Sequence, residues 1–296
     1  MGDLVSPLLP GQLNESNLKT ILVCGASGAG KSKFINSVTG ANLSVGHGID
    51  SETDRVIDEG IPLIKHGANY IQLVDTPGFQ DTRDGDEIPV FKNITEWLAA
   101  RYAGKLRAVG LIYLRSIQEA RVLRPETRLI QMFKDLCGDD CLDRVVLVTN
   151  RWQLDSDNEE EDREKAIISD TRRFGSTGAK KVQVRRLQNK YKTEDAMEIV
   201  KLFATSPPIT LQIQREIVDH GVPFNETTAG SHIEADLRKR IEEMDKNNEA
   251  LRKNLEYAQR QIEELKNRPT WGDLFGRIIA GVATLGVTEV VRAFKS

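Results

Sequence analysis

One short segment constrains this chain more than any other. Residues 25–32 read G-A-S-G-A-G-K-S and fit the pattern G-x-x-x-x-G-K-[S/T]. An apolar run at 21–24 predicts a strand before them, and a helix is predicted to begin at Ser32. Glycines in such a turn let the backbone wrap closely around phosphates, so that successive N–H groups meet their oxygens. The segment therefore predicts a phosphate-binding loop.

Two polar side chains carry the chemistry that this spacing predicts. Lys31 is expected to reach the β- and γ-phosphates of a nucleoside triphosphate, and the hydroxyl of Ser32 is expected to ligate Mg²⁺. The alternative is a glycine-rich turn that happens to precede a helix, and a second motif at the appropriate distance argues against it. The candidate nucleotide contacts of the loop are Gly25, Ser27, Gly28, Ala29, Gly30, Lys31, Ser32 and Lys33.

The second motif is Asp75-Thr76-Pro77-Gly78, which directly follows an apolar strand predicted at 70–74. A carboxylate at the end of such a strand can hold Mg²⁺, usually through water, and the N–H of Gly78 can sense the γ-phosphate. Taken alone, D-T-P-G is also a good β-turn sequence. Its place after the phosphate-binding loop predicts that Asp75 belongs to the metal site and Gly78 to the catalytic site.

A polar segment at 40–54 lies between the first predicted helix and the second predicted strand and is long enough to move. We expect it to be the first switch loop. Thr53 is our candidate for the hydroxyl that closes on Mg²⁺ and the γ-phosphate, because it lies just before a predicted strand. Ser51 and Ser44 remain open as alternatives.

Strands and helices alternate from about residue 20 onward, which predicts a doubly wound α/β fold with a mostly parallel six-stranded sheet. The acidic stretch 155–164 is expected to be a solvated loop leading into a helix, without a function. Beyond 21–24, the predicted strands are 56–64 and 70–74 around a turn at 65–69, then 109–114, 145–148 and 181–187, and the predicted helices include 125–136 and 194–203.

Charge and cysteine content bear on the partners and the cellular compartment that we expect for this chain. The formal net charge is −3, so there is no overall basic field, and nucleic acid is not an expected partner. Three cysteines cannot pair completely and no secretory signal is recognised, which predicts a cytoplasmic protein. Cys137 and Cys141 are interpreted as ordinary helix-end residues, because four histidines and no second cysteine pair make a zinc site a poor expectation.

Taken together, the motifs resemble the Ras-like P-loop GTPase superfamily over approximately residues 18–205. The closest resemblance is to predicted fungal G-domain proteins, which are similar to septin, immunity-associated and chloroplast import-receptor GTPases. It implies a switch that binds GTP and GDP with Mg²⁺ and hydrolyses GTP. The phrases that carry it are V-G-H-G at 45–48, D-T-P-G-F at 75–79, L-I-Y at 111–113, M-F-K-D-L-C-G at 132–138, V-L-V-T-N at 146–150 and L-Q-I-Q-R-E at 211–216.

This sequence departs from the Ras-like pattern at the residue that orients the attacking water. Ras-like enzymes have a glutamine directly after D-x-x-G, whereas this chain has Phe79, with Gln80 as the neighbouring catalytic candidate. A phenyl ring cannot orient water by hydrogen bonding. We therefore expect slow hydrolysis, or a group supplied by a second subunit, for which Arg115 and Arg121 are candidates.

A second departure concerns the nucleotide base. Guanine specificity in GTPases normally comes from N-K-x-D at a strand end. Here Asn150 and Arg151 fit the first two positions while Gln153 replaces the carboxylate, and similar divergence occurs in the resembling families. Thr149, Asn150 and Arg151 are our candidate base contacts. The resemblance favours GTP over ATP. Trp152 either stacks on the base or fills the core beneath it.

The C-terminal third changes character. A heptad stripe predicts a coiled-coil helix over 231–268, with a single helix folded against the G domain as the alternative. The apolar stretch at 278–287 is too short to span a membrane, and it could contact a membrane surface, a partner or the chain's own core. The stripe consists of Leu237, Ile241, Met244, Asn248, Leu251, Leu255, Ala258, Ile262 and Leu265.

These observations divide the chain into a flexible tail at 1–17, a G domain at 18–205, a helix and linker at 206–230, the coiled-coil helix and an apolar tail at 269–296. We expect a homodimer, through the G domain, the coiled coil or both, and a protein effector whose identity the sequence does not indicate. Two rival functions stay open, namely an ATP-dependent P-loop enzyme and a non-catalytic nucleotide-binding scaffold.

Overall fold

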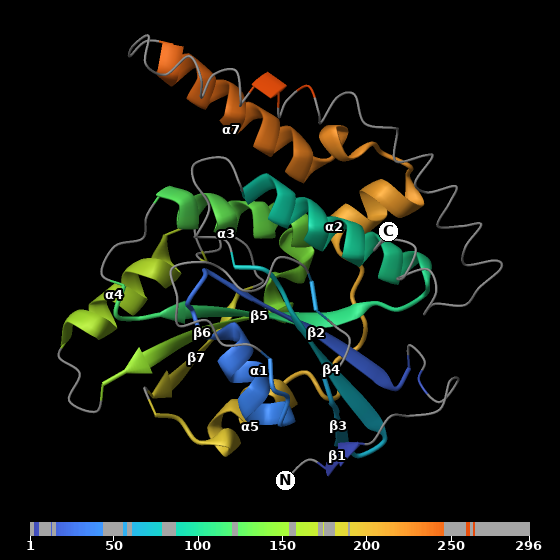
Figure 1. The fold of residues 1–296 in the computed structure, drawn as a ribbon, viewed down its shortest axis with the longest axis vertical. Coiled ribbons are helices and arrows are strands. Elements are labelled where there is room, and N and C mark those ends of the chain that lie inside the picture. The colour runs from blue at the N-terminus through green and yellow to red at the C-terminus, as the bar shows by residue number, and fades with distance from the viewer. Residues whose placement is uncertain are drawn as a thin grey trace.

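The computed structural model describes residues 3–5, 13, 16–43, 56–57, 61–78, 87–119, 124–153, 158–170, 174, 181–188, 190–245, 259–260 and 263. Their centre is a seven-stranded sheet in the order β1-β3-β4-β2-β5-β6-β7 (Figure 1). Neighbouring strands from β4 to β7 are parallel, whereas β3 is antiparallel to both β1 and β4. The strands are β1 (Asp3–Val5), β2 (Leu18–Gly25), β3 (Leu63–His66), β4 (Asn69–Asp75), β5 (Ala108–Ser116), β6 (Val145–Trp152) and β7 (Gln183–Gln188).

Helices cover both faces of the sheet, as Figure 1 shows. Phe34 of α1 and Met197 of α5 belong to the core on one face, and Phe91 of α2, Phe133 of α3 and Ile167 of α4 belong to the core on the other. The helices are α1 (Lys31–Thr39), α2 (Glu87–Ala103), α3 (Arg124–Cys137), the 3₁₀ turn η1 (Asp139–Arg144), α4 (Asn158–Ser169) and α5 (Thr193–Lys201). The doubly wound class is therefore confirmed.

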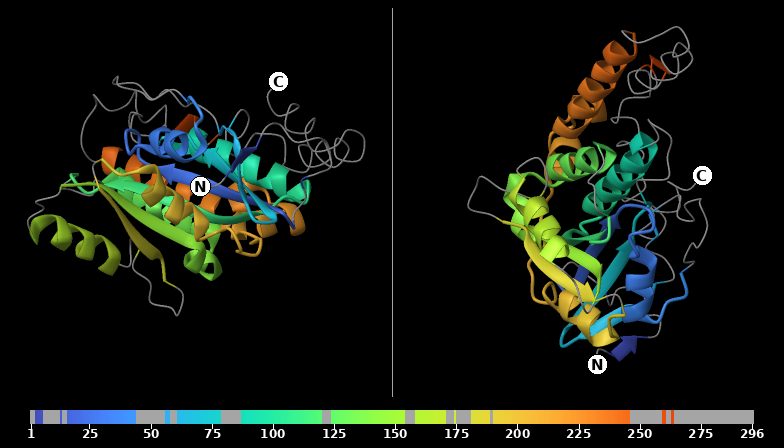
Figure 2. Two further views of the ribbon diagram at one scale, coloured as in Figure 1. Left: turned by 90° about the horizontal axis from the view of Figure 1, so that it is seen from below. Right: turned by 90° about the vertical axis from the view of Figure 1, so that its left-hand side faces the viewer.

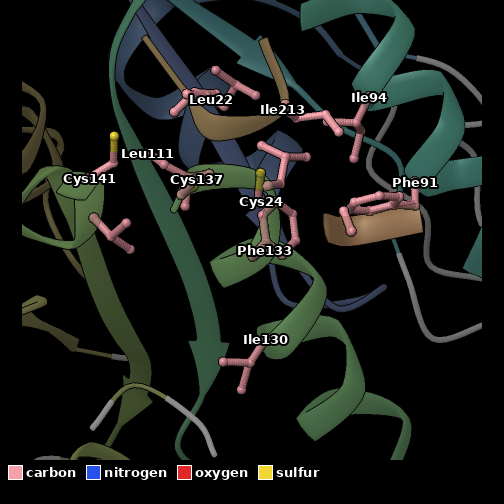
Figure 3. Close-up of a cluster of buried hydrophobic side chains, with 14 of the residues drawn as sticks. Leu22, Cys24, Phe91, Ile94, Leu111, Ile130, Phe133, Cys137, Cys141 and Ile213 are labelled. Carbon is pink, nitrogen blue, oxygen red and sulfur yellow. The ribbon is translucent and has the colours of Figure 1, made fainter. Parts of the chain in front are cut away.

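The central strands form where apolar residues run without interruption. Every residue of β2 and β5 is buried, because each strand has a neighbour on both sides and helices on both faces. Cys24 on β2, Cys137 at the end of α3 and Cys141 in η1 all belong to the core on the α2–α3 side of the sheet (Figure 3), and none of them forms a disulfide. Burial raises the pKa of the Cys24 thiol to about 12 and raises that of Cys137 as well, so both are held as uncharged packing groups.

After α5 the chain returns to the α2–α3 side of the sheet and ends its described part in a long helix, α7 (Thr228–Asp245). Ala229, Ile233 and Leu237 bury their side chains in the core, and Nδ1 of His232 lies 2.7 Å from Oδ2 of Asp135 on α3. The helix extends beyond α3 (Figures 1 and 2). It is preceded by α6 (Gln212–Gln214), the π-helix η2 (Arg215–Asp219) and the 3₁₀ turn η3 (Phe224–Glu226).

Two predictions about the fold need correction, and one helix was missed. The sheet has seven strands instead of six, because Asp3–Val5, inside the predicted tail at 1–17, pairs with β3. The strand predicted at 56–64 is shorter, since Ile57 forms an isolated bridge with Asp75 and β3 begins only at Leu63. Helix α2 was not predicted, because its apolar residues are spread around its circumference instead of forming one stripe.

The start of the predicted coiled-coil helix also differs in the structure. The helix begins at Thr228 instead of 231, and the first residue of the predicted seam, Leu237, packs in the core of this chain. Apolar residues spaced by three and four positions can pack either against a second helix or against the chain's own domain. Most of the stripe, and the apolar tail at 269–296, lie outside the described residues. Within the part of the chain that the structure describes, no helix is long and apolar enough to cross a membrane.

Candidate nucleotide site

The predicted phosphate-binding loop connects the end of β2 to the start of α1 at the carboxyl edge of the parallel strands. Gly25 has a φ of +146°, which L side chains rarely adopt, and a Cβ there would lie 2.3 Å from the carbonyl oxygen of Leu114 on β5. Only a glycine lets the loop leave β2 this close to its neighbour. The loop is thereby set at the switch point of the sheet, where doubly wound folds bind ligands.

Lys31 is buried beneath this loop. Its Nζ donates hydrogen bonds to the carbonyl oxygens of Gly25 at 3.2 Å and Ala26 at 3.1 Å. The ammonium is thus held by the backbone of the same loop whose N–H groups would face a phosphate chain. A cation in this position can form charge-assisted hydrogen bonds with phosphate oxygens.

Ser32 and Asp75 meet as the metal-site prediction requires. The Ser32 hydroxyl donates to Oδ2 of Asp75 at 2.7 Å, although the two residues come from different elements. Burial raises the pKa of the Asp75 carboxyl above its ordinary value, while the Ser32 hydrogen bond and the charge of Lys31 lower it. Oδ1 of Asp75 is buried and has no hydrogen-bond partner among the described residues. A hydroxyl and a partly unsatisfied carboxylate are oxygen ligands of the kind that Mg²⁺ prefers.

Gly78 lies against the phosphate-binding loop. A Cβ at Gly78 would lie 2.7 Å from Cα and 3.0 Å from the backbone nitrogen of Ser27, so the two backbones are in direct contact. Thr76 fixes the start of this segment, because its hydroxyl donates to the Val23 carbonyl at 3.0 Å. The D-T-P-G segment therefore joins the site as predicted, with the Gly78 backbone beside the loop.

Some predicted groups cannot be placed. Thr53 and its alternatives Ser51 and Ser44 lie outside the described residues, as do Phe79, Gln80 and Arg121. Ile57 exchanges two backbone hydrogen bonds with Asp75, at 2.8 and 2.9 Å, so the chain that follows residue 53 returns to the edge of the metal site.

The predicted base loop also meets the phosphate-binding loop. Nδ2 of Asn150 donates to the Ala29 carbonyl at 2.7 Å, and Nη2 of Arg151 donates to the Gly28 carbonyl at 2.6 Å. Arg151 has a φ of +62°, unusual for a residue with a side chain. Oδ1 of Asn150 is buried without a hydrogen-bond partner among the described residues, so an acceptor is still available beside the loop.

Thr149 and Trp152 face the other way. Trp152 is 2% exposed, and its Nε1 donates to the Thr149 hydroxyl at 2.9 Å. That hydroxyl donates to Oε1 of Glu164 on α4 at 2.7 Å, and the Arg186 guanidinium lies 4.2 Å above the Trp152 ring. Trp152 therefore fills the core instead of offering a stacking face. The side chain of Thr149, a predicted nucleotide contact, serves packing, because alternation along β6 turns it away from Asn150.

Two further predictions are wrong. The acidic stretch 155–164 is helical from residue 158, and Glu160 and Glu164 are buried within it, one helical turn apart. Arg115 is not available to reach the nucleotide of a second subunit. It is 2% exposed, and its guanidinium donates to the carbonyls of Ser116 and Glu119 at 3.1 and 3.3 Å. Lys33, a predicted contact, is exposed, with Nζ 5.9 Å from the Tyr191 ring centre.

A family model and several known proteins match part of this chain. Residues 20–151 match a family model described as 50S ribosome-binding GTPase. Human septin-1 is 32% identical over 128 residues, which is 38% of this chain and 33% of that protein. The Drosophila melanogaster protein peanut is 31% identical over 126 residues, 38% of this chain and 23% of that protein. The chain thus spans about a third or less of these curated relatives.

Solved structures are similar to part of this chain at low sequence identity. A structure of the chloroplast translocon components atToc33 and psToc159 has a TM-score of 0.50 at 16% identity, covering 65% of this chain and 87% of that one. Toc33 from Arabidopsis thaliana, in complex with Mg²⁺ and GMPPNP, has a TM-score of 0.49 at 17% identity with the same coverage. At this identity the likeness concerns the fold alone.

Proposed function

Because this chain carries a GTPase domain of the P-loop class, similar to that of septins, we propose that it binds GTP and GDP with Mg²⁺ as a conformational switch. We further propose that it hydrolyses GTP slowly and is regulated by self-association. One observation carries the proposal. Lys31 and Ser32 at the start of α1, Asp75 at the end of β4 and Asn150 on β6 come from three separate segments and converge on one loop at the carboxyl edge of the sheet.

Each of these groups has a definite task in the proposal. Lys31 would exchange its bonds to loop carbonyls for bonds to the β- and γ-phosphates. Ser32 and Asp75 would hold Mg²⁺, with Thr53 as a further proposed ligand, and the bound ion would neutralise charge on the phosphate oxygens. The backbone of Gly78, in contact with Ser27, would respond to the presence of the γ-phosphate.

Slow turnover is proposed from the residue after D-x-x-G. Phe79 offers no hydrogen bond to an attacking water, and Gln80 is the nearest amide in sequence. An isolated subunit is expected to hydrolyse GTP on the order of 10⁻⁴ s⁻¹ or less, as unassisted switch GTPases do. The three free buried cysteines suit a reducing compartment, and the cytoplasm is the setting that we propose.

Calorimetric titration with GTP, GDP and ATP in the presence of Mg²⁺ tests nucleotide choice. We expect GTP and GDP to bind more tightly than ATP, and Asn150→Ala to weaken GTP binding about tenfold, because the amide that joins the base loop to Ala29 is lost. ATP binding as tight as GTP binding would contradict guanine specificity. Failure of all three nucleotides to bind would contradict the proposed function.

Self-association is tested by truncating the chain after Asp245. This end point keeps Ile233 and Leu237 in the core, which a cut near residue 230 would remove. We expect light scattering to give a dimer for the full chain and a monomer for the truncated one. GTP turnover per subunit is expected to rise with the concentration of the full chain only, because the coiled coil raises the effective concentration of the partner domain. A monomeric full chain with a concentration-independent rate would refute this regulation.

A further inference from the structure

The end of β5 and the short loop that follows it, together residues 115–119, contact both α4 and β6 at the edge of the candidate base pocket. The backbone N–H of Ile117 donates to the Asn150 carbonyl at 3.0 Å, and Arg163 of α4 donates to the Ile117 carbonyl at 3.3 Å. The buried guanidinium of Arg115 binds carbonyls of the same loop. The loop is therefore fixed to α4 on one side and to the end of β6 on the other.

Gln118 makes the contact that bears on the nucleotide site. Its Nε2 donates to the backbone carbonyl of Arg151 at 3.1 Å and also to Oε1 of Glu160. Arg151 is the residue with φ of +62° whose guanidinium reaches the Gly28 carbonyl. A left-handed conformation is unfavourable for a residue with a side chain and persists only where neighbours hold it. Gln118 is one of those neighbours.

Glu160 determines which way the Gln118 amide points. The glutamate is 5% exposed, and its Oε2 is buried without a hydrogen-bond partner among the described residues. An ionised carboxylate only accepts hydrogen bonds, as does the Arg151 carbonyl. If the Gln118 amide were flipped, its oxygen would face both acceptors. The buried carboxylate therefore holds the NH₂ group toward Arg151.

We propose that Gln118 is a positioning residue for the base pocket, that Glu160 orients its amide, and that together they hold the Arg151 turn in the conformation that receives the base. The inference rests on the proposed function and names two residues outside the recognised nucleotide motifs. The inference predicts an effect on base binding alone, because the turn at Arg151 is proposed to contact the base, whereas Lys31 and Ser32 are proposed to bind the phosphates and their metal ion. Removing the Gln118 amide should lower the affinity for nucleotides without lowering the affinity for a bare polyphosphate.

The experiment compares Gln118→Ala, Glu160→Gln and the full-length wild type by calorimetry with GTP, GDP and inorganic tripolyphosphate, each with Mg²⁺. For Gln118→Ala we expect GTP and GDP affinity to fall by the same factor, about tenfold, with tripolyphosphate affinity unchanged. Glu160→Gln keeps the size of the side chain but removes its charge, so a smaller loss in the same direction is expected. It also gives a reading if the alanine variant does not fold.

A matched control is Gln131→Ala, because the Gln131 amide also donates to a buried carboxylate, that of Asp135, at 2.9 Å on α3. It is expected to leave all three affinities unchanged. GTP affinity equal to wild type in both Gln118→Ala and Glu160→Gln would overturn the inference, and so would an equal loss of tripolyphosphate affinity. A wild type that binds tripolyphosphate but neither GTP nor GDP would overturn the proposed function as well, which separates the two failures.

Discussion

Lys31→Ala is expected to lower the affinity for Mg²⁺–GTP by at least about a hundredfold. The ammonium is the cation held inside the phosphate-binding loop, and two or more charge-assisted bonds to phosphate, each of about 1.5–3 kcal/mol, would be lost. In the nucleotide-free protein its Nζ donates to the carbonyls of Gly25 and Ala26. We expect the nucleotide-free variant to keep a cooperative unfolding transition. Calorimetry with GTP and a thermal melt without nucleotide measure the two quantities.

Two comparisons make the Lys31 result specific. Lys201→Ala removes a lysine that pairs with Glu198 on α5 at 2.7 Å, and it should bind GTP as the wild type does. Ser32→Ala should weaken Mg²⁺-dependent binding of GTP more than that of GDP, because the hydroxyl is proposed to act through the ion between the phosphates. Wild-type affinity in both the Lys31 and Ser32 variants would contradict the phosphate-binding assignment.

The sequence predicts this site well where chemistry and burial demand particular residues. The spacing from Gly25 to Ser32 follows from the geometry of a loop that wraps phosphates, and the strands at 109–114 and 145–148 are continuous apolar runs because both of their faces are covered. Edge strands carry a weaker signal. β3 is only partly buried, and the three residues of β1 are too few for any alternating pattern to be read.

The buried glutamates show why other parts could not be predicted. In a run of acidic residues, Glu160 and Glu164 cannot be told from their exposed neighbours, since acidic side chains are rarely buried without partners. The partners come from distant positions: Thr149 and Arg186 lie 15 and 22 residues from Glu164, and Gln118 lies 42 residues from Glu160. The only local signal was the spacing of four residues, which puts both glutamates on one face of a helix.

Arg115 illustrates a different limit. A cation after a central strand at the carboxyl edge looked available to a second subunit, but alternation along β5 points it to the opposite face from Leu114, toward the core that contains Tyr113. There its guanidinium closes a tight turn by binding the carbonyls of Ser116 and Glu119. The direction of one side chain thus changes a proposed catalytic group into part of the loop that supports Gln118.

A large loss of stability is expected for Gly25→Ala. The added Cβ would lie 2.3 Å from the oxygen and 3.2 Å from the carbon of the Leu114 carbonyl, and φ of +146° is unfavourable for alanine whatever the space. Neither backbone can yield easily, because β2 and β5 are adjacent central strands that are buried along their whole length. We expect the free energy of unfolding to fall by roughly 3 kcal/mol or more, in a denaturant titration, with loss of GTP binding.

Gly67→Ala separates the clash from the cost of the backbone conformation. Gly67 has φ of +59° in the turn between β3 and β4, and a Cβ there would meet nothing within 4 Å. Only the left-handed cost of about 1 kcal/mol should appear, and GTP affinity should stay at the wild-type value, because this turn is at the opposite end of β4 from Asp75. Equal unfolding midpoints for the two variants would mean that the loop and β5 can separate, and the phosphate-binding loop would then not be held by the sheet as the Leu114 contact requires.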